Sequence, residues 1–141
     1  MSVESCIDTN VFTYHLEKAD ARRFMIADTI IREAIATGSA CISFQVVQEC
    51  LNTMLRKASI PLDTAGMRDY LDIVLLPLVR VPASADLYRR SLEVRERYGF
   101  SFYDALIVAA ALEAGCTRLW SEDLQHGQHI GVLQVENPFR A

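Results

Sequence analysis

Four acidic residues occupy positions where a parallel sheet would gather its functional side chains. Asp8 and Asp123 each come just after a short apolar segment. A third short apolar segment is followed by a predicted helix, and Glu49 lies one to two turns into that helix. Asp104 lies in the first turn of another predicted helix. Because ligands bind at the carboxyl ends of the strands in such sheets, we expect these carboxylates to converge.

Carboxylates that converge repel one another and raise one another's pKa, and a divalent cation removes that repulsion. A set of oxygen ligands suits Mg²⁺ or Mn²⁺. An ion held in this way supports phosphoryl-transfer chemistry, because it lowers the pKa of a bound water and stabilises charge on phosphate oxygens. Asp8 and Asp104 lie in apolar sequence with no Lys or Arg within three residues, so burial would be costly without a cation.

Three of these acids also have a purely structural interpretation. Asp8 has the residue type that stabilises a following turn by a side-chain hydrogen bond. Asp104 stands three residues after Ser101, which is the spacing of a capping box at a helix start. Asp123 could cap a short turn that ends at Gly127. Taken one at a time, none of these residues identifies a site.

Glu49 has a different alternative, which comes from the helical wheel. The apolar stripe of its helix is made of Val46, Val47, Cys50, Met54 and Leu55. Glu49 points away from that stripe, together with Gln45, Asn52 and Arg56. By the wheel alone, Glu49 is a solvated residue.

Strands and helices are predicted to alternate along the chain. The expected strands cover residues 3–7, 40–43, 78–81, 117–120 and 130–135. The expected helices cover residues 20–37, 43–58, 84–98 and 101–114, with Ser43, Ser84 and Ser101 at three of the N-termini and a further helix beginning near Pro61. Short apolar strands between helices favour an α/β fold: a three-layer α/β/α sandwich around a mostly parallel sheet of five strands.

Composition favours one soluble domain spanning residues 1–141. Hydrophobic residues make up 51% and charged residues 23%, and no stretch reaches the 18 or so apolar residues of a membrane helix. The first ten residues lack the pattern of a signal peptide, so we expect a cytoplasmic protein.

The net charge of -4 argues against bulk electrostatic capture of nucleic acid, although a bound cation would change the local field. The pairs Arg22-Arg23 and Arg89-Arg90 fit either phosphate contacts or solvated helix faces.

The residues that bind soft metals form no recognisable motif. No C-x-x-C pair is present, and we expect the cysteines to be buried free thiols of a reducing compartment: Cys6, Cys41, Cys50 and Cys116. His126 and His129 lie three residues apart near Asp123, but without the frame of a zinc site. His15 is expected on the surface of a first helix, which precedes the one expected over residues 20–37.

The segments that carry the four acids resemble the motifs of PIN-domain ribonucleases, in particular the toxins of bacterial type II toxin–antitoxin pairs (VapC-like proteins). The resemblance spans essentially the whole chain. It rests on these segments in order: IDTNVF at 7–12, QVVQE at 45–49, FYDALI at 102–107, WSEDLQ at 120–125 and NPF at 137–139.

This resemblance implies a metal-dependent ribonuclease with a PIN-like fold. Asp8, Glu49, Asp104 and Asp123 would form the acidic site, with Asp8, Asp104 and Asp123 holding Mg²⁺ or Mn²⁺ and with Ser121 and Asn10 in support. The polar face of the Glu49 helix would then look into the catalytic groove, which replaces the solvated interpretation. The implied partners are an RNA substrate, a cognate antitoxin protein and a second copy of the chain in a homodimer.

Two other functions remain open at this stage. An aspartyl-phosphate phosphatase or receiver domain would use Asp8 as nucleophile. Such a site requires a second acid two residues later, where this chain has Asn10, and a Lys after a late strand. The two lysines of this chain, Lys18 and Lys57, lie in predicted helical segments instead. A non-catalytic RNA-binding module would be expected to show a basic stripe with interleaved aromatic residues, and the net charge is negative.

Overall fold

The computed structural model describes residues 3–140, so residues 1–2 and 141 of the predicted domain lie outside it. The strands are β1 Ser5–Ile7, β2 Ala40–Ser43, β3 Val79–Val81, β4 Arg118–Trp120, β5 His129–Ile130 and β6 Leu133–Glu136. The α-helices are α1 Thr9–Glu17, α2 Ala21–Thr37, α3 Phe44–Arg56, α4 Thr64–Tyr70, α5 Ala85–Tyr98 and α6 Phe102–Glu113. A π-helical turn, Leu71–Leu75, and a 3₁₀ turn, Leu76–Leu78, lead from α4 to β3.

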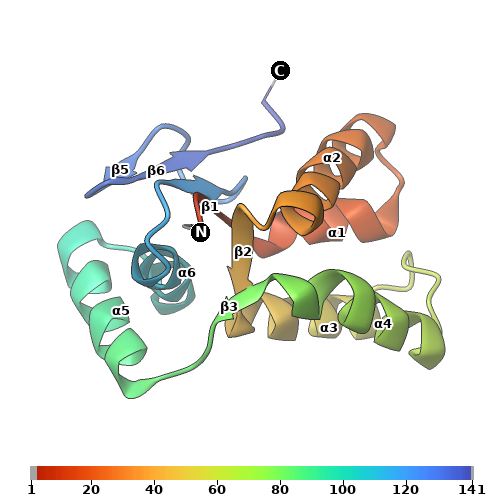
Figure 1. Cartoon of the computed structure of the whole chain (residues 1–141), viewed down its shortest axis with the longest axis horizontal. Coiled ribbons are helices and arrows are strands. Elements are labelled where there is room, and N and C mark those ends of the chain that lie inside the picture. The colour runs from red at the N-terminus through yellow and green to blue at the C-terminus, as the bar shows by residue number, and fades with distance from the viewer. Residues whose placement is uncertain (1–2, 141) are drawn as a thin grey trace.

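The six strands form one sheet in the order β3-β2-β1-β4-β6-β5. All neighbouring pairs are parallel except β5 and β6, which are antiparallel. Helices flank the sheet, with α1 and α2 on one side and α5 and α6 on the other (Figure 1). The predicted α/β fold with a mostly parallel central sheet is therefore confirmed.

β1 is the point at which the order of the strands reverses. The chain places β2 and then β3 on one side of β1, and it returns to place β4 on the other side. In open α/β sheets a crevice opens at such a point, outside the carboxyl ends of the strands. Asp8 comes directly after β1 and is therefore at the mouth of this crevice.

The predicted sheet had five strands, and this number is wrong. The single strand expected over residues 130–135 is a hairpin, with β5 and β6 joined at Gly131 and Val132. Gly131 has a φ of 60°, in the left-handed region that glycine enters without steric cost, and this allows the tight reversal. Periodicity could not separate this hairpin from one longer strand, because buried apolar residues occur in both halves: Ile130 in β5, and Leu133 and Val135 in β6.

The N-termini of the helices mostly follow the predicted caps. Ser84 and Ser101 accept backbone hydrogen bonds at the starts of α5 and α6. Ser43 is in the capping position of α3, but its side chain makes no capping hydrogen bond. The helix expected near Pro61 begins instead at Thr64, because the Asp63 carboxylate accepts a hydrogen bond from the backbone of the first turn.

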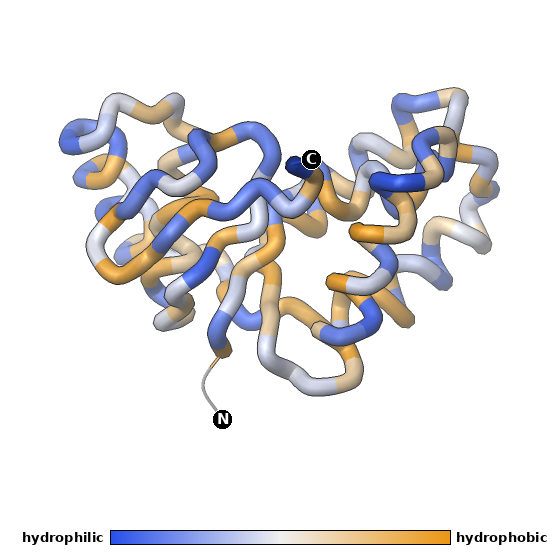
Figure 2. Tube along the Cα trace, turned by 90° about the horizontal axis from the view of Figure 1, so that it is seen from above, coloured by the Kyte–Doolittle hydropathy of each residue, from blue (hydrophilic) through white to orange (hydrophobic). Residues whose placement is uncertain are grey.

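The core lies between the sheet and the helices. β1 and β2 are buried along their whole length, as expected for parallel strands that are covered on both faces. Helix α6 is buried from Ala105 to Ala111, as expected for a helix that is apolar on all sides. Hydrophobic residues occur along the whole trace, interleaved with hydrophilic ones (Figure 2). Leu55, predicted in the buried stripe of its helix, is instead 74% exposed.

None of the helices within residues 3–140 combines the length and the apolar character needed to cross a bilayer.

Leu119 and Leu55 give a matched test of this core. Leu119 lies in the central strand β4 with 0% of its surface exposed, so Leu119→Ala should lower the free energy of unfolding by about 2–5 kcal/mol. Leu55→Ala changes the same atoms on an exposed helix face and should shift it by less than about 0.5 kcal/mol. Urea unfolding followed by circular dichroism measures both. Equal losses in the two variants would contradict the burial described here.

Candidate active site

A groove of about 330 Å³ opens at the carboxyl ends of the central strands. All four predicted acids line it: Asp8, Glu49, Asp104 and Asp123. The remaining lining residues are mostly polar: Thr9, Asn10, Thr13, Gln45, Asn52, Thr53, Arg56 and Ile107. Four segments distant in the sequence thus contribute to a single concave surface: the start of α1, helix α3, helix α6 and the loop after β4.

Asp8 is the most buried acid of the groove, with only 6% of its surface exposed. It caps α1, because its Oδ1 accepts a hydrogen bond from the backbone N–H of Thr9 at 2.7 Å. Its Oδ2 accepts a hydrogen bond from Ser121 Oγ at 2.8 Å. Burial raises the pKa of Asp8 to about 7; these two hydrogen bonds oppose the rise, and the charges of Asp123 and Glu49 add to it. The capping interpretation and the site interpretation therefore apply to the same side chain.

Glu49 is half-buried and faces the groove rather than bulk solvent. Its Oε1 accepts a hydrogen bond from Thr9 Oγ1 at 2.5 Å, and its Oε2 accepts one from Gln45 Nε2 at 3.4 Å. Gln45 itself is buried and also donates to the backbone oxygen of Tyr103. The polar face of α3, which the helical wheel alone would assign to water, forms one wall of the groove.

Asp104 and Asp123 complete the acidic lining from two other directions. Asp104 lies in the first turn of α6 and is half-buried, and its backbone N–H donates to Ser101 Oγ. Asp123 lies in the loop after β4 and is exposed. Within residues 3–140, no three of the acidic side chains have carboxylate oxygens that all lie within 4.8 Å of one another. The acids share one groove but are spaced around it.

Ser121 and Asn10 hold the loop that carries Asp123 against the start of α1. Ser121 has no exposed surface, and its Oγ also accepts a hydrogen bond from the backbone N–H of Leu124. Asn10 Oδ1 accepts one from the backbone N–H of Glu122. Asn10 Nδ2 is buried without a hydrogen-bond partner in the described part of the chain, beside a groove that its own residue lines.

Glu122 fixes the same loop from its outer side. Tyr14 donates a hydrogen bond from its hydroxyl to Glu122 Oε1 at 2.5 Å, and Arg23 approaches Glu122 Oε2 to 3.4 Å. These contacts tie the loop after β4 to α1 and α2. Sequence reasoning assigned no role to Glu122, because only the fold shows that its neighbour Asp123 faces the groove while Glu122 faces the helices.

His15, predicted on the surface of a helix, is half-buried, with 16% of its side chain exposed. Its Nδ1 is 2.8 Å from the Tyr70 hydroxyl, and its Nε2 is 2.9 Å from Asp28 Oδ1. Its ring stacks on that of Phe24 with centroids 5.4 Å apart. Burial lowers its pKa, although Asp28 opposes this. The helical pattern could not reveal that α2 and Tyr70 cover this face of α1.

His126, near Asp123, and Arg22, from one of the arginine pairs, make contacts within the fold. His126 Nδ1 accepts a hydrogen bond from the backbone N–H of Asn137, and His126 and His129 join no metal-binding group among the described residues. Arg22 donates to the backbone oxygens of Phe139 and Arg140, so it holds the C-terminal segment against α2.

The groove residues that were given no role from the sequence include three that are charged or position Glu49: Thr9, Gln45 and Arg56. Thr9 and Gln45 position Glu49, and Arg56 is the basic residue of the lining described above. A signal for two of them existed, because Gln45, Glu49 and Arg56 share the polar face of one helix. Once Glu49 is placed in a site, that spacing places its neighbours there as well.

The donor chemistry of the groove fits a hard divalent cation. Its ionisable ligands are carboxylates, and the charges of Glu49 and Asp123 already disfavour ionisation of Asp8. Mg²⁺ usually keeps several bound waters and takes only one or two carboxylates directly, so acids spaced around a groove suit it better than a tight cage would. No lysine or histidine lines the described groove to compete for this role.

The PIN domain family profile matches residues 5–128, so the chain belongs to the PIN domain family. No curated protein sequence gives a significant match.

Similar solved structures agree with this fold. A toxin–antitoxin complex from Klebsiella pneumoniae has a chain that is 17% identical, with a TM-score of 0.65 and with 98% of this chain and 100% of that chain covered. VapBC2 from Rickettsia felis, bound to a promoter DNA fragment, is 17% identical with a TM-score of 0.68 and coverage of 96% and 98%. VapC20 from Mycobacterium tuberculosis, a sarcin-ricin loop cleaving toxin, is 21% identical with a TM-score of 0.60 and coverage of 85% and 92%. At these identities the likeness shows a shared fold.

The raised pKa of Asp8 predicts a pH-dependent cost to stability. The folded chain binds a proton at Asp8 between its ordinary pKa of 3.8 and about 7, so stability is lost as pH rises through this window. Asp8→Asn should therefore be more stable than wild type at pH 8 in EDTA, by at most about 4 kcal/mol, and the advantage should shrink towards pH 4. Chemical unfolding at several pH values measures it. A difference that stays constant with pH would contradict the assignment; Asp72→Asn, at an exposed position, is the control.

Proposed function

We propose that the chain is a metal-dependent endoribonuclease that hydrolyses RNA phosphodiester bonds. One observation supports this most strongly: four carboxylates from distant segments line a single groove at the carboxyl ends of parallel strands. Membership of the PIN family adds support, because the segments that carry these acids resemble the motifs of its ribonucleases. We further propose that residues 1–141 act as one nuclease domain.

The acids receive different roles in this proposal. Asp8, Asp104 and Asp123 would hold Mg²⁺ or Mn²⁺, and Glu49 would complete the ligand set or orient the attacking water. When bound, such an ion supplies a water of lowered pKa and stabilises charge on the phosphate oxygens. The proposed reaction is an in-line displacement by water, with no covalent bond between the chain and the phosphate.

The surrounding side chains would keep these acids in place. Thr9 and Gln45 donate to the two oxygens of Glu49, which limits its rotation. The Ser121 hydroxyl favours the ionised form of Asp8 against the effect of burial. Arg56 lines the groove beside these acids, and a guanidinium suits contacts with the phosphates of an RNA backbone.

The aspartyl-phosphate alternative has less support. Asn10 occupies the position at which aspartyl-phosphate chemistry requires a second acid. Its Oδ1 accepts a hydrogen bond from the backbone N–H of Glu122. Lys57 pairs with Glu17 at 2.7 Å, and neither Lys18 nor Lys57 lines the groove. A non-catalytic RNA-binding module is also less supported, because the groove is lined by four acids and a single basic residue.

We propose that the chain acts as the toxin of a toxin–antitoxin pair in the cytoplasm, with a cognate antitoxin protein that covers the groove and with a homodimer as the assembled form. The similar fold of toxin chains in complexes from Klebsiella pneumoniae and Rickettsia felis supports this proposal. Co-expression with the product of the neighbouring gene tests it: the two proteins should co-purify, and growth arrest should be relieved.

Asp8→Asn should abolish RNA cleavage. We expect induced wild-type chain to create new RNA ends that carry a 5′-phosphate, and we expect Asp8→Asn to reduce their yield at least about 100-fold, since it alters a proposed metal ligand. Sequencing of RNA 5′ ends measures this in cells, and EDTA should stop cleavage of a purified transcript. Asp72→Asn, an exposed carboxylate outside the groove, is the control. Identical RNA ends from wild type and Asp8→Asn would refute the nuclease proposal.

Thr9→Val should lower the rate without removing a carboxylate. It deletes the hydroxyl that donates to Glu49 Oε1 and keeps the size of the side chain. A reduction of about 10-fold in the cleavage rate is expected, as for other residues that orient a ligand. Thr9→Ser keeps the hydroxyl and should restore most of the rate. If Thr9→Val and Thr9→Ser behave alike, the hydrogen bond has no positioning role.

A further inference from the structure

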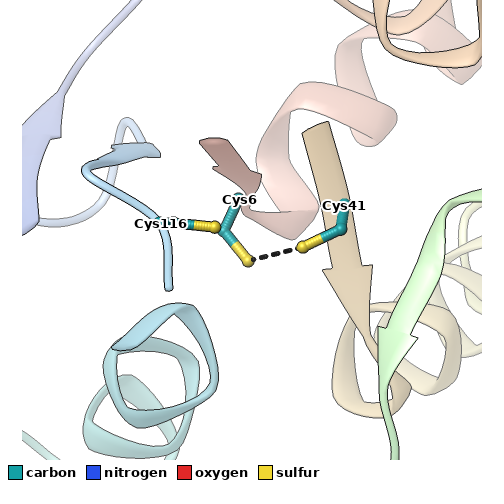
Figure 3. Close-up of side chains that lie close together, drawn as sticks. All are labelled: Cys6, Cys41 and Cys116. Carbon is teal, nitrogen blue, oxygen red and sulfur yellow. Dashed lines mark hydrogen bonds between the residues drawn. The ribbon is translucent and has the colours of Figure 1, made fainter. Parts of the chain in front are cut away.

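Three of the four cysteines meet in the core, away from the acidic groove. Cys6 lies in β1, Cys41 in β2, and Cys116 just before β4 (Figure 3). The sulfurs of Cys6 and Cys41 are 3.4 Å apart, and all three sulfurs lie within 4.8 Å of one another. All three residues are at most 4% exposed, and the cysteines are free thiols.

The register of the sheet produces this cluster. Cys6 and Cys41 are direct partners in neighbouring parallel strands, so their side chains point to the same face. Cys116 reaches them from the segment between α6 and β4, where its backbone N–H donates to the oxygen of Ala111. The spacing of these residues along the chain does not predict the cluster, because the three cysteines come together only when the strands pair.

We propose that Cys6, Cys41 and Cys116 form a binding site for one soft monovalent metal ion, Cu(I), held by the three sulfurs. Metal–sulfur bonds of about 2.3 Å around a three-coordinate ion place the sulfurs about 4 Å apart. The cluster has one sulfur pair at 3.4 Å and no pair beyond 4.8 Å, so small side-chain rotations bring it to this spacing. The proposal is independent of the nuclease proposal and concerns a different part of the chain.

The number and type of ligands select the ion. Thiolates prefer Cu(I) or Zn²⁺ to Mg²⁺ or Mn²⁺. Zn²⁺ is almost always four-coordinate in structural sites, whereas this group contains three ligands and belongs to the buried core. Cu(I) accepts trigonal sulfur coordination. The pKa of Cys41 is lowered by hydrogen bonds from Cys116 and Cys6 and by the charge of Arg80, whereas the pKa values of Cys6 and Cys116 are raised, so the ion must displace the protons of these two thiols.

Binding would join the central strands to one another. The three sulfurs come from β1, from β2 and from the segment that enters β4, and these are three neighbouring parts of the sheet. An ion that binds only the folded chain stabilises it by mass action. We therefore expect Cu(I) to raise the melting temperature, independently of any divalent cation.

The experiment supplies Cu(I) alone, without oxygen and during refolding of the full chain because the cluster is buried. Titration against a competing Cu(I) chelator should give one ion per chain, and ultraviolet thiolate-to-copper absorption should appear. Cys6→Ala, Cys41→Ala and Cys116→Ala should each lose the site. Cys50→Ala, at the buried cysteine outside the cluster, should keep it and is the matched control.

A second measurement uses only the wild-type chain, so it holds even if a variant fails to fold. X-ray absorption of the copper complex should give three sulfur ligands at about 2.3 Å and no nitrogen or oxygen ligand. Nitrogen or oxygen ligands, no bound ion in the folded wild type, or equal loss of binding in Cys50→Ala would overturn the proposal.

Discussion

The burial of the Asp8 carboxylate is the constraint around which the rest of the site is arranged. An ionised carboxylate with 6% of its surface exposed is unfavourable unless several groups compensate for the lost water. The first turn of α1 supplies a backbone N–H, and the loop after β4 supplies the Ser121 hydroxyl. Even so, burial and two neighbouring acids keep the pKa of Asp8 raised. Such a residue persists at a cost to stability, which is typical of a functional position.

The topology of the sheet makes this arrangement possible. β1 is central and has β2 and β4 as parallel neighbours. The carboxyl ends of these three strands therefore lie side by side at the same edge of the sheet. The segment after β1 begins with Asp8, the segment after β2 is the helix of Glu49, and the segment after β4 holds Ser121 and Asp123. Glu122 then ties the last of these segments to α1 and α2, which holds the loop that carries Asp123 in place.

Local sequence patterns predicted the elements well and their contacts less well. The strand ends, most helix caps and the parallel sheet follow from apolar runs, Gly and Ser at particular positions, and this part is confirmed. The hairpin at Gly131, the start of α4 and the partial burial of His15 depend on which element packs against which, and the chain pattern does not contain this information. Glu49 illustrates the difference: the wheel correctly separates its face from the apolar stripe, but it cannot tell a groove from bulk water.

The cysteine cluster also depends on contacts between elements that the local sequence pattern does not contain. Cys6 lies in β1 and Asp8 follows the end of that strand, so the two are only two residues apart. Their surroundings nevertheless differ completely: Cys6 has sulfur neighbours in the core, whereas Asp8 has carboxylate neighbours in an open groove. Hard cations have little affinity for thiolates, and a soft ion has little affinity for carboxylates. Under the two proposals, the fold therefore keeps a soft-metal site and a hard-metal site apart over a very short distance. Cys6 is paired with its neighbour inside the sheet, whereas Asp8 lies where the strand ends and the helix begins. Pairing of the strands creates the first environment, and termination of the strand creates the second.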